Sequence, residues 1–194
     1  MNILLHVCCG NCAIYPVKKL REQNHNLTGY FFNHNIHPYQ EYHRRLETAK
    51  EYAQKVELPL QVEDQYLLEE FLAQVADSPQ QRCRYCYFAR LEKTAQKATE
   101  LGIEAFSTTL LYSRYQNQNQ IIDFGHQLAA QYQLIFIDQD FRFGWREGIQ
   151  ISKEMGLYRQ QYCGCIYSER DRFYPKGKSR RTPASPAAGD GSLT

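Results

Sequence analysis

The chain has 194 residues, a formal net charge of +2 and a hydrophobic fraction of 43%. These values are typical of a soluble globular protein with one main core, and the apolar runs are too short to span a membrane. Lys176, Lys178, Arg180 and Arg181 outweigh Asp190 near the end, so the rest of the chain carries no basic excess. Bulk positive charge is therefore excluded as a basis for nucleic-acid binding, which would need a local patch.

Short apolar stretches alternate with amphipathic ones along most of the chain. This alternation predicts a parallel, doubly wound α/β sheet, a Rossmann-like three-layer domain over residues 1–175. The predicted strands are Asn2–Val7, Leu27–Phe32, Leu60–Glu63, Glu104–Thr109 and Leu134–Ile137. The predicted helices are Asn11–Gln23, Tyr39–Val56, Tyr66–Val75, a long one within Ser78–Glu100, Asn119–Tyr132 and Trp145–Met155. Residues 176–194 are rich in Gly, Ser, Pro and Ala, which predicts a disordered low-complexity tail.

Seven cysteines fall in three tight groups, at Cys8, Cys9 and Cys12, at Cys83 and Cys86, and at Cys163 and Cys165. Thiolates this close in sequence can point at a common centre, as a soft metal or an iron–sulfur cluster requires. In proteins with an open parallel sheet, bound molecules lie beyond the carboxyl ends of the strands. The first cysteines follow the first predicted strand. We therefore expect a cysteine-rich metal site at this edge. The lack of a secretory signal favours the cytoplasm, where thiols stay reduced.

Other interpretations of the cysteines remain open at this point. Cys9 and Cys12 have the spacing of a thioredoxin-type dithiol, which could form a disulfide. Four cysteines could hold a structural zinc, but three would then be left over. A cubane cluster also takes four, and the other three could bind a second metal with an open coordination position. Gly164 would permit the turn that two thiols spaced by one residue need.

Several motifs together resemble the QueH-type epoxyqueuosine reductases, over roughly residues 1–172 and in the same order. They are His6–Cys12, Tyr30–Asn33 with Asn35–Pro38, Arg82–Cys86, Phe106–Leu110 and Gly156–Cys165. The resemblance implies a cytoplasmic oxidoreductase that converts epoxyqueuosine to queuosine at the anticodon wobble position of tRNA. It also implies a HUP-like α/β fold with a 4Fe–4S cluster and an adjacent mononuclear iron. The expected partners are the tRNA and an external low-potential electron donor, without a membrane, and we expect a monomer.

The resemblance leads to expected roles for individual residues. Cys9, Cys83, Cys86 and Cys163 are expected on the cluster, and Cys8, Cys12 and Cys165 on the second iron. Some members place a carboxylate at the position of Cys12, which is why it is given to the second metal. Asp140 and Tyr162 are assigned to proton donation from their places in the chain, after the fifth predicted strand and beside the cysteine turn. His37 is a further candidate, and each of these residues could instead have a structural role. Substrate binding is assigned to polar residues near strand ends and to one arginine, namely Asn33, His37, Ser107, Thr108, Thr109 and Arg159.

Contacts with RNA should use basic and aromatic side chains. The phosphate candidates are Arg44, Arg45, Arg82, Arg84, Arg142, Arg146 and Arg159, and the stacking candidates are Phe32, Tyr39, Tyr85 and Phe143. An iron–sulfur tRNA sulfur-transferase on a similar fold and a zinc-binding structural module are the alternative functions. The first strand is followed by no Ser-Gly-Gly-x-Asp-Ser pyrophosphate loop, which argues against ATP-dependent chemistry.

Overall fold

The computed structural model of this chain describes residues 1–174. The tail predicted over 176–194 lies outside the described residues, so the proposed division at residue 175 stays a prediction. The strands are β1 (Asn2–His6), β2 (Asn26–Phe31), β3 (Leu60–Val62), β4 (Ala105–Thr108) and β5 (Ile135–Phe136). The α-helices are α1 (Gly10–Glu22), α2 (Tyr39–Lys55), α3 (Leu68–Val75), α4 (Arg82–Glu100), α5 (Gln118–Tyr132), α6 (Trp145–Glu154) and α7 (Ile166–Phe173). Short 3₁₀ turns are η1 (Pro79–Gln81), η2 (Thr109–Tyr112) and η3 (Arg142–Gly144).

The five strands form one parallel sheet in the order β3-β2-β1-β4-β5. At the end of the central strand, His6 lies opposite Tyr30 on one side and Thr108 on the other. The carboxyl ends of β1, β2 and β4 therefore meet at one edge of the sheet. This topology confirms the predicted parallel α/β fold, and it brings the segments after these three strands together.

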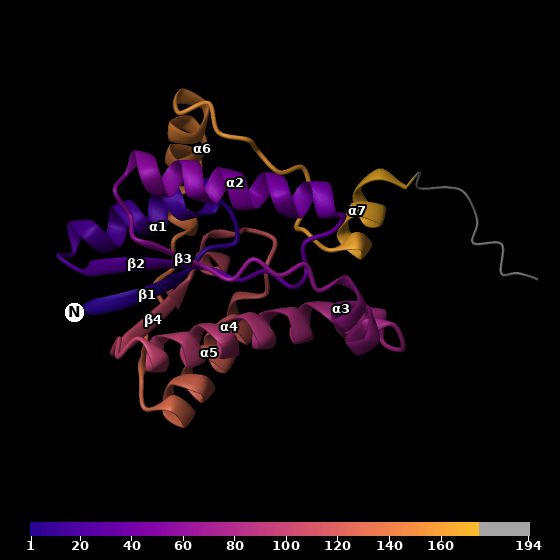
Figure 1. The fold of residues 1–194 in the computed structure, drawn as a ribbon, viewed down its shortest axis with the longest axis horizontal. Coiled ribbons are helices and arrows are strands. Elements are labelled where there is room, and N and C mark those ends of the chain that lie inside the picture. Colours follow the sequence, from indigo (N-terminus) through magenta and orange to yellow (C-terminus); the bar gives the residue numbers. More distant parts are fainter. Residues whose placement is uncertain (175–194) are drawn as a thin grey trace, which may run out of the picture.

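Helices cover both faces of the sheet (Figure 1). Helix α1 packs against α2 and α6 on one side, while α4 packs against α5 on the other. Ile3, Leu4 and Leu5 of β1 are fully buried between the layers. A strand that is covered on both faces has to be apolar along its length, which explains its continuous apolar sequence. The predicted three-layer architecture is thus confirmed.

Some element boundaries differ from the predictions. Helix α3 begins at Leu68, two residues after the predicted start at Tyr66. Helix α4 agrees with the prediction of a long helix within Ser78–Glu100, because it begins at Arg82 after the turn at Pro79. Helix α7 was not predicted, and it buries none of its residues, so it has no apolar stripe to detect. Within residues 1–174, no helix has both the length and the apolarity needed to cross a bilayer.

Candidate metal centre

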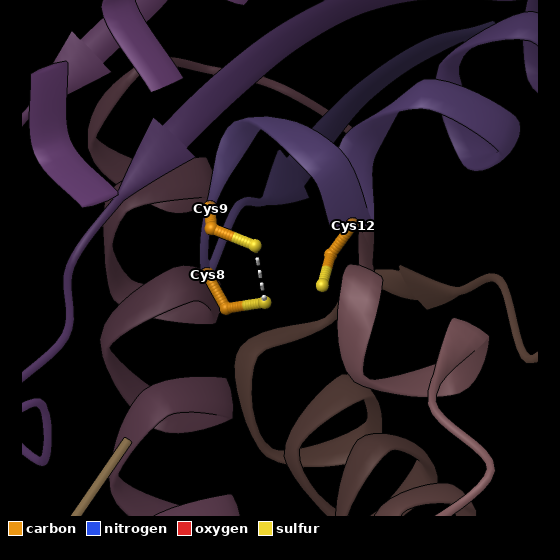
Figure 2. Close-up of side chains that lie close together, drawn as sticks. All are labelled: Cys8, Cys9 and Cys12. Carbon is orange, nitrogen blue, oxygen red and sulfur yellow. Dashed lines mark hydrogen bonds between the residues drawn. The ribbon is translucent and has the colours of Figure 1, made fainter. Parts of the chain in front are cut away.

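Three thiols meet where the loop after β1 leads into the first turn of α1. The sulfurs of Cys8, Cys9 and Cys12 all lie within 4.8 Å of one another, and the side chains are buried (Figure 2). Gly10 makes this arrangement possible, because a Cβ at this position would lie 2.5 Å from the carbonyl oxygen of Thr48. Only a glycine lets the first turn of α1 approach α2 this closely. We call these three residues the three-thiol group.

The three-thiol group shares its protons unequally. Hydrogen bonds from Cys12 and Cys9 lower the pKa of Cys8 well below its usual value, although burial opposes this effect. Interactions with Cys8 and Cys9, together with burial, raise the pKa of Cys12. Cys8 is therefore the thiol that ionises first, with its neighbours as donors. Three buried sulfurs that share protons in this way are suited to bind a metal cation in place of those protons.

The other four cysteines form a second set, which we call the four-thiol group. Cys83 and Cys86 lie in the first turns of α4, and Cys163 and Cys165 lie in the segment before α7. Burial raises the pKa of Cys86 to about 12, and the charges of Cys163, Cys165 and Cys83 add to this rise. Gly164 has a φ of +150°, so the turn between the two later cysteines needs glycine. The charges of the two later cysteines thus raise the pKa of both thiols on α4, which places the group in one electrostatic environment.

Polar donors point at five of the seven sulfurs. The Thr109 hydroxyl lies 3.3 Å from Cys8 Sγ, and the Arg90 guanidinium lies 3.0 Å from Cys86 Sγ. The three remaining donors are Gln160 Nε2 to Cys12 at 3.2 Å, Gln116 Nε2 to Cys163 at 3.1 Å and the backbone N–H of Ser168 to Cys165 at 3.3 Å. Such donors favour thiolates over thiols, which is the form that binds metal.

A cavity of about 720 Å³ opens beside these groups. It is lined by cysteines of both groups, Cys8, Cys12 and Cys163. Basic, aromatic and amide side chains complete the wall, among them Arg90, Tyr112, Trp145, Arg159 and Gln160. A cavity of this size takes a small organic group, which would lie directly against sulfur atoms of both thiol groups.

Three of the predicted substrate residues are engaged inside the protein. Ser107 donates to the carbonyl of Ile137, and Thr108 caps the turn of η2 and bonds to His6. Asn33 donates to the carbonyl of Val7 at 3.0 Å. These contacts hold the strand ends in place. None of these three residues is among those that line the cavity, so their direct contact with the substrate stays a prediction.

Thr109 and Arg159 do line the cavity, and Arg159 is exposed there. His37 is buried, and neither ring nitrogen has a hydrogen-bond partner among the described residues. Its backbone N–H donates to the carbonyl of Gly164 at 2.8 Å, which places it beside the four-thiol group. His34, which sequence reasoning did not select, is buried with two unpartnered ring nitrogens as well.

The two predicted proton donors lie in different places. Tyr162 lines the cavity, and its hydroxyl donates to the carbonyl of His37 at 2.6 Å. Asp140 is not among the lining residues, and its carboxylate pairs with Arg142 at 2.7 Å. The hydrogen bond from Arg142 lowers the pKa of Asp140, so this carboxylate holds no proton at neutral pH. The geometry therefore favours Tyr162 of the two.

Two of the RNA-contact predictions are wrong. Arg45 is 2% exposed and pairs with Glu41 at 2.7 Å, so its charge is already used inside the protein. Phe32 is 4% exposed and offers no ring face to an external base. Both are buried by tertiary packing, which their local sequence does not indicate. Phe143, by contrast, is 87% exposed.

Sequence reasoning missed several residues of the site. Arg90 lies one helical turn after Cys86, so the i, i+4 spacing on α4 was the signal that could have found it. Gln116 and Gln160 could not have been found in this way, because each meets its cysteine only through the tertiary fold. All seven thiols are free in the structure.

The fold and this site together define a Rossmann-like α/β protein with a candidate metal centre at the carboxyl edge of its sheet. A family model described as "Epoxyqueuosine reductase QueH" matches residues 3–171. The chain therefore belongs to the epoxyqueuosine reductase QueH family, and it is an oxidoreductase.

Curated proteins with the name epoxyqueuosine reductase QueH are similar to this chain over most of its length. The protein from Dehalococcoides mccartyi is 37% identical over 96% of this chain and 98% of its own length. The protein from Thermotoga maritima is 35% identical over 88% of this chain and 92% of its own. Among solved structures, a predicted subunit of tRNA methyltransferase from Methanocaldococcus jannaschii has a TM-score of 0.55. It covers 79% of this chain and 75% of that one at 14% identity, so the likeness shows the fold alone.

Proposed function

We propose that this chain reduces epoxyqueuosine to queuosine in the anticodon wobble position of tRNA, with the help of iron held by its seven cysteines. The observation that carries the proposal is the shared cavity, which is lined by Cys8 and Cys12 of one thiol group and by Cys163 of the other. A substrate in this cavity would meet both groups at once. The names of the family and of its relatives supply the identity of the substrate.

The residues present suit iron. Seven thiols, five of them with polar donors at the sulfur, provide the anionic soft ligands that iron–sulfur clusters take. Two buried histidines beside the four-thiol group, His34 and His37, have unpartnered ring nitrogens that could donate to a bound anionic cluster. A bound cluster supplies single electrons at low potential, and an iron with an open coordination position polarises an oxygen as a Lewis acid.

The grouping of the sulfurs supports a division of ligands that differs from the one expected from the sequence. We assign Cys83, Cys86, Cys163 and Cys165 to the cluster, and Cys8, Cys9 and Cys12 to the mononuclear iron. In this division Cys9 and Cys165 exchange the roles that the resemblance suggested. The close approach of the sulfurs of Cys8, Cys9 and Cys12 supports it. The charges of the two later cysteines, which raise the pKa of Cys83 and Cys86, support it too.

The side chains around the cavity would bind the substrate and deliver protons. Conversion of an epoxide to an alkene consumes two electrons and two protons, and the oxygen leaves as water. Tyr162 is the proposed source of one proton, because it lines the cavity and its hydroxyl, which donates to the His37 carbonyl in the structure, is protonated at neutral pH. Arg159 and Gln160 would orient the polar substituents of the base from the cavity wall.

The mouth of the cavity suits an unpaired nucleotide. Tyr115 is 84% exposed and meets Trp145 edge-on, and the guanidinium of Arg114 lies 5.5 Å from the centre of the Trp145 ring. Aromatic faces next to arginines stack on splayed-out bases and attract phosphates. A tRNA substrate, reduced thiols and a soluble electron donor also suit the cytoplasm, and we propose a monomer that works there.

The proposal is tested with the full chain, reconstituted anaerobically with iron and sulfide. The protein is incubated with dithionite and with tRNA that carries epoxyqueuosine, and the nucleosides are then analysed by mass spectrometry. Queuosine should form, and about five irons with four sulfides should be bound per chain. Iron-loaded protein that leaves epoxyqueuosine unchanged would contradict the reaction. One zinc per chain and no sulfide would support the structural zinc module instead.

A further inference from the structure

Arg90 is a buried positive charge whose hydrogen bonds do not reach a carboxylate. It is 2% exposed, and its guanidinium donates to Cys86 Sγ at 3.0 Å, to the Cys86 carbonyl at 3.3 Å and to Asn33 Oδ1 at 3.3 Å. The other buried arginine, Arg45, pairs with Glu41. A buried guanidinium needs a compensating charge. For Arg90 the groups at hand are cysteines, which become thiolates when they bind metal.

Those cysteines belong to both groups. Cys86, which the guanidinium contacts at 3.0 Å, is a member of the four-thiol group. Arg90 also lines the cavity together with Cys8 and Cys163. The same guanidinium therefore faces thiols of the three-thiol group and of the four-thiol group.

Hydrogen bonds lead from Arg90 to the three-thiol group through Asn33. Arg90 Nη1 donates to Asn33 Oδ1, and Asn33 Nδ2 donates to the carbonyl of Val7 at 3.0 Å. Val7 immediately precedes Cys8, whose backbone N–H donates to Thr109 Oγ1 at 3.1 Å. Asn33 is buried, so this path from Cys86 to the residue before Cys8 runs through the interior of the protein.

We propose that Arg90 is a positioning residue that, with Asn33, joins the two thiol groups and supplies the positive charge that both share. The inference rests on the proposed function for the iron that these groups bind. Each one-electron reduction adds one negative charge at the four-thiol group, and a guanidinium in contact with Cys86 attracts that charge. Interactions of this kind are strong where water is excluded, so Arg90 raises the midpoint potential of the bound cluster.

The test compares Arg90→Gln, Arg90→Lys and wild type as full chains reconstituted anaerobically. Iron and sulfide per chain are measured first, and the midpoint potential is then followed by electron paramagnetic resonance during stepwise reduction with dithionite. In Arg90→Gln the potential should become more negative, making reduction about tenfold or more less favourable, while iron stays bound. In Arg90→Lys the retained charge should keep the potential near that of wild type.

Thr94→Val provides the matched control. Thr94 is one turn further along α4, is fully buried and donates to the Arg90 carbonyl at 2.7 Å. This substitution disturbs the same helix without changing charge, so the potential should not move. A wild-type potential in Arg90→Gln would overturn the inference. Equal shifts in Arg90→Gln and Arg90→Lys would overturn it too, because they would indicate packing and not charge.

Asn33→Asp tests the same idea if Arg90→Gln does not fold. The new carboxylate would face the guanidinium and neutralise it without removing the arginine, so the potential should again become more negative. An unchanged potential in Asn33→Asp would contradict the inference. These readouts require no epoxyqueuosine. If wild type forms queuosine but the variants have the wild-type midpoint potential, only the role of Arg90 is refuted. If the variants shift the potential but wild type forms no queuosine, only the proposed reaction is refuted.

Discussion

The two thiol groups are assembled in different ways. The three-thiol group comes from one short segment, the end of the loop after β1 and the first turn of α1, and it is buried with all its sulfurs within 4.8 Å of one another. The four-thiol group brings the start of α4 together with the segment before α7, and Cys83 and Cys163 are exposed. Local chain geometry is thus enough to build the first, whereas the second depends on tertiary packing. The first should tolerate changes elsewhere in the protein, and the second should respond to them.

Cys83→Ser should have the largest effect. Cys83 is exposed, so the metal-free chain should fold normally while the proposed cluster loses a ligand. We expect loss of the four-thiol iron together with activity, by about 100-fold or more. Iron analysis and the epoxyqueuosine-tRNA assay measure both, and the melting curve of the metal-free protein serves as the control. Full activity in this variant would remove the four-thiol group from the reaction.

Arg45→Gln should come next, because Arg45 connects α2 to the later cysteines. Its guanidinium donates to the carbonyls of Cys163 at 2.7 Å and Tyr162 at 2.9 Å and pairs with the buried Glu41. Breaking a buried ion pair from one side costs about 3–5 kcal/mol. Urea unfolding should show this loss, whereas the exposed neighbour variant Arg44→Gln should stay within about 0.5 kcal/mol of wild type. Equal stability of the two variants would contradict the structural role of Arg45.

Acid should weaken the surroundings of the four-thiol group. Burial lowers the pKa of His34 to about 3 and that of His37 to about 4, against an ordinary value of 6.5. Both histidines are neutral above pH 6.5; below it the unfolded chain binds protons that the folded chain does not. The metal-free protein should therefore lose about 2 kcal/mol per histidine between pH 7 and pH 5.

Urea unfolding at several pH values measures this slope. Burial also lowers the pKa of His6 to about 3, so His34→Phe should remove about a third of the slope. His43→Gln, at an exposed position, should leave it unchanged. A stability that does not fall on acidification would show that these rings are protonated or solvated in the folded protein.

Cys12→Asp should have the smallest effect. Some members of the family are expected to have a carboxylate here, and the compact loop should present an oxygen ligand nearly as well as sulfur. Activity should stay within about tenfold of wild type with the extra iron retained, while Cys12→Ala should lose that iron and keep the four-thiol iron. If Cys12→Asp also lost the four-thiol iron, the two groups would not be separate sites.

Much of this architecture could be predicted from the sequence, because the apolar run from Ile3 to Leu5 and the amphipathic helices carry their own periodicity. The seven cysteines could be selected for the same local reason, since each group is compact in sequence. Their division could not be predicted, because the contact of α4 with the segment before α7 is tertiary. The burial of Arg45 and Phe32 was missed for that reason too, and α7 was missed because it has no buried face.

The dependence of the four-thiol group on distant segments also has a consequence for the order of events during synthesis. Cys83 and Cys86 leave the ribosome well before Cys163 and Cys165, whereas the first loop is complete as soon as α1 has been made. Domains generally fold as units, and metal binding is linked to folding. Loading of the four-thiol group must therefore wait until the segment with Cys163 and Cys165 has been made, which sets the earliest time at which a cofactor can be delivered to this centre.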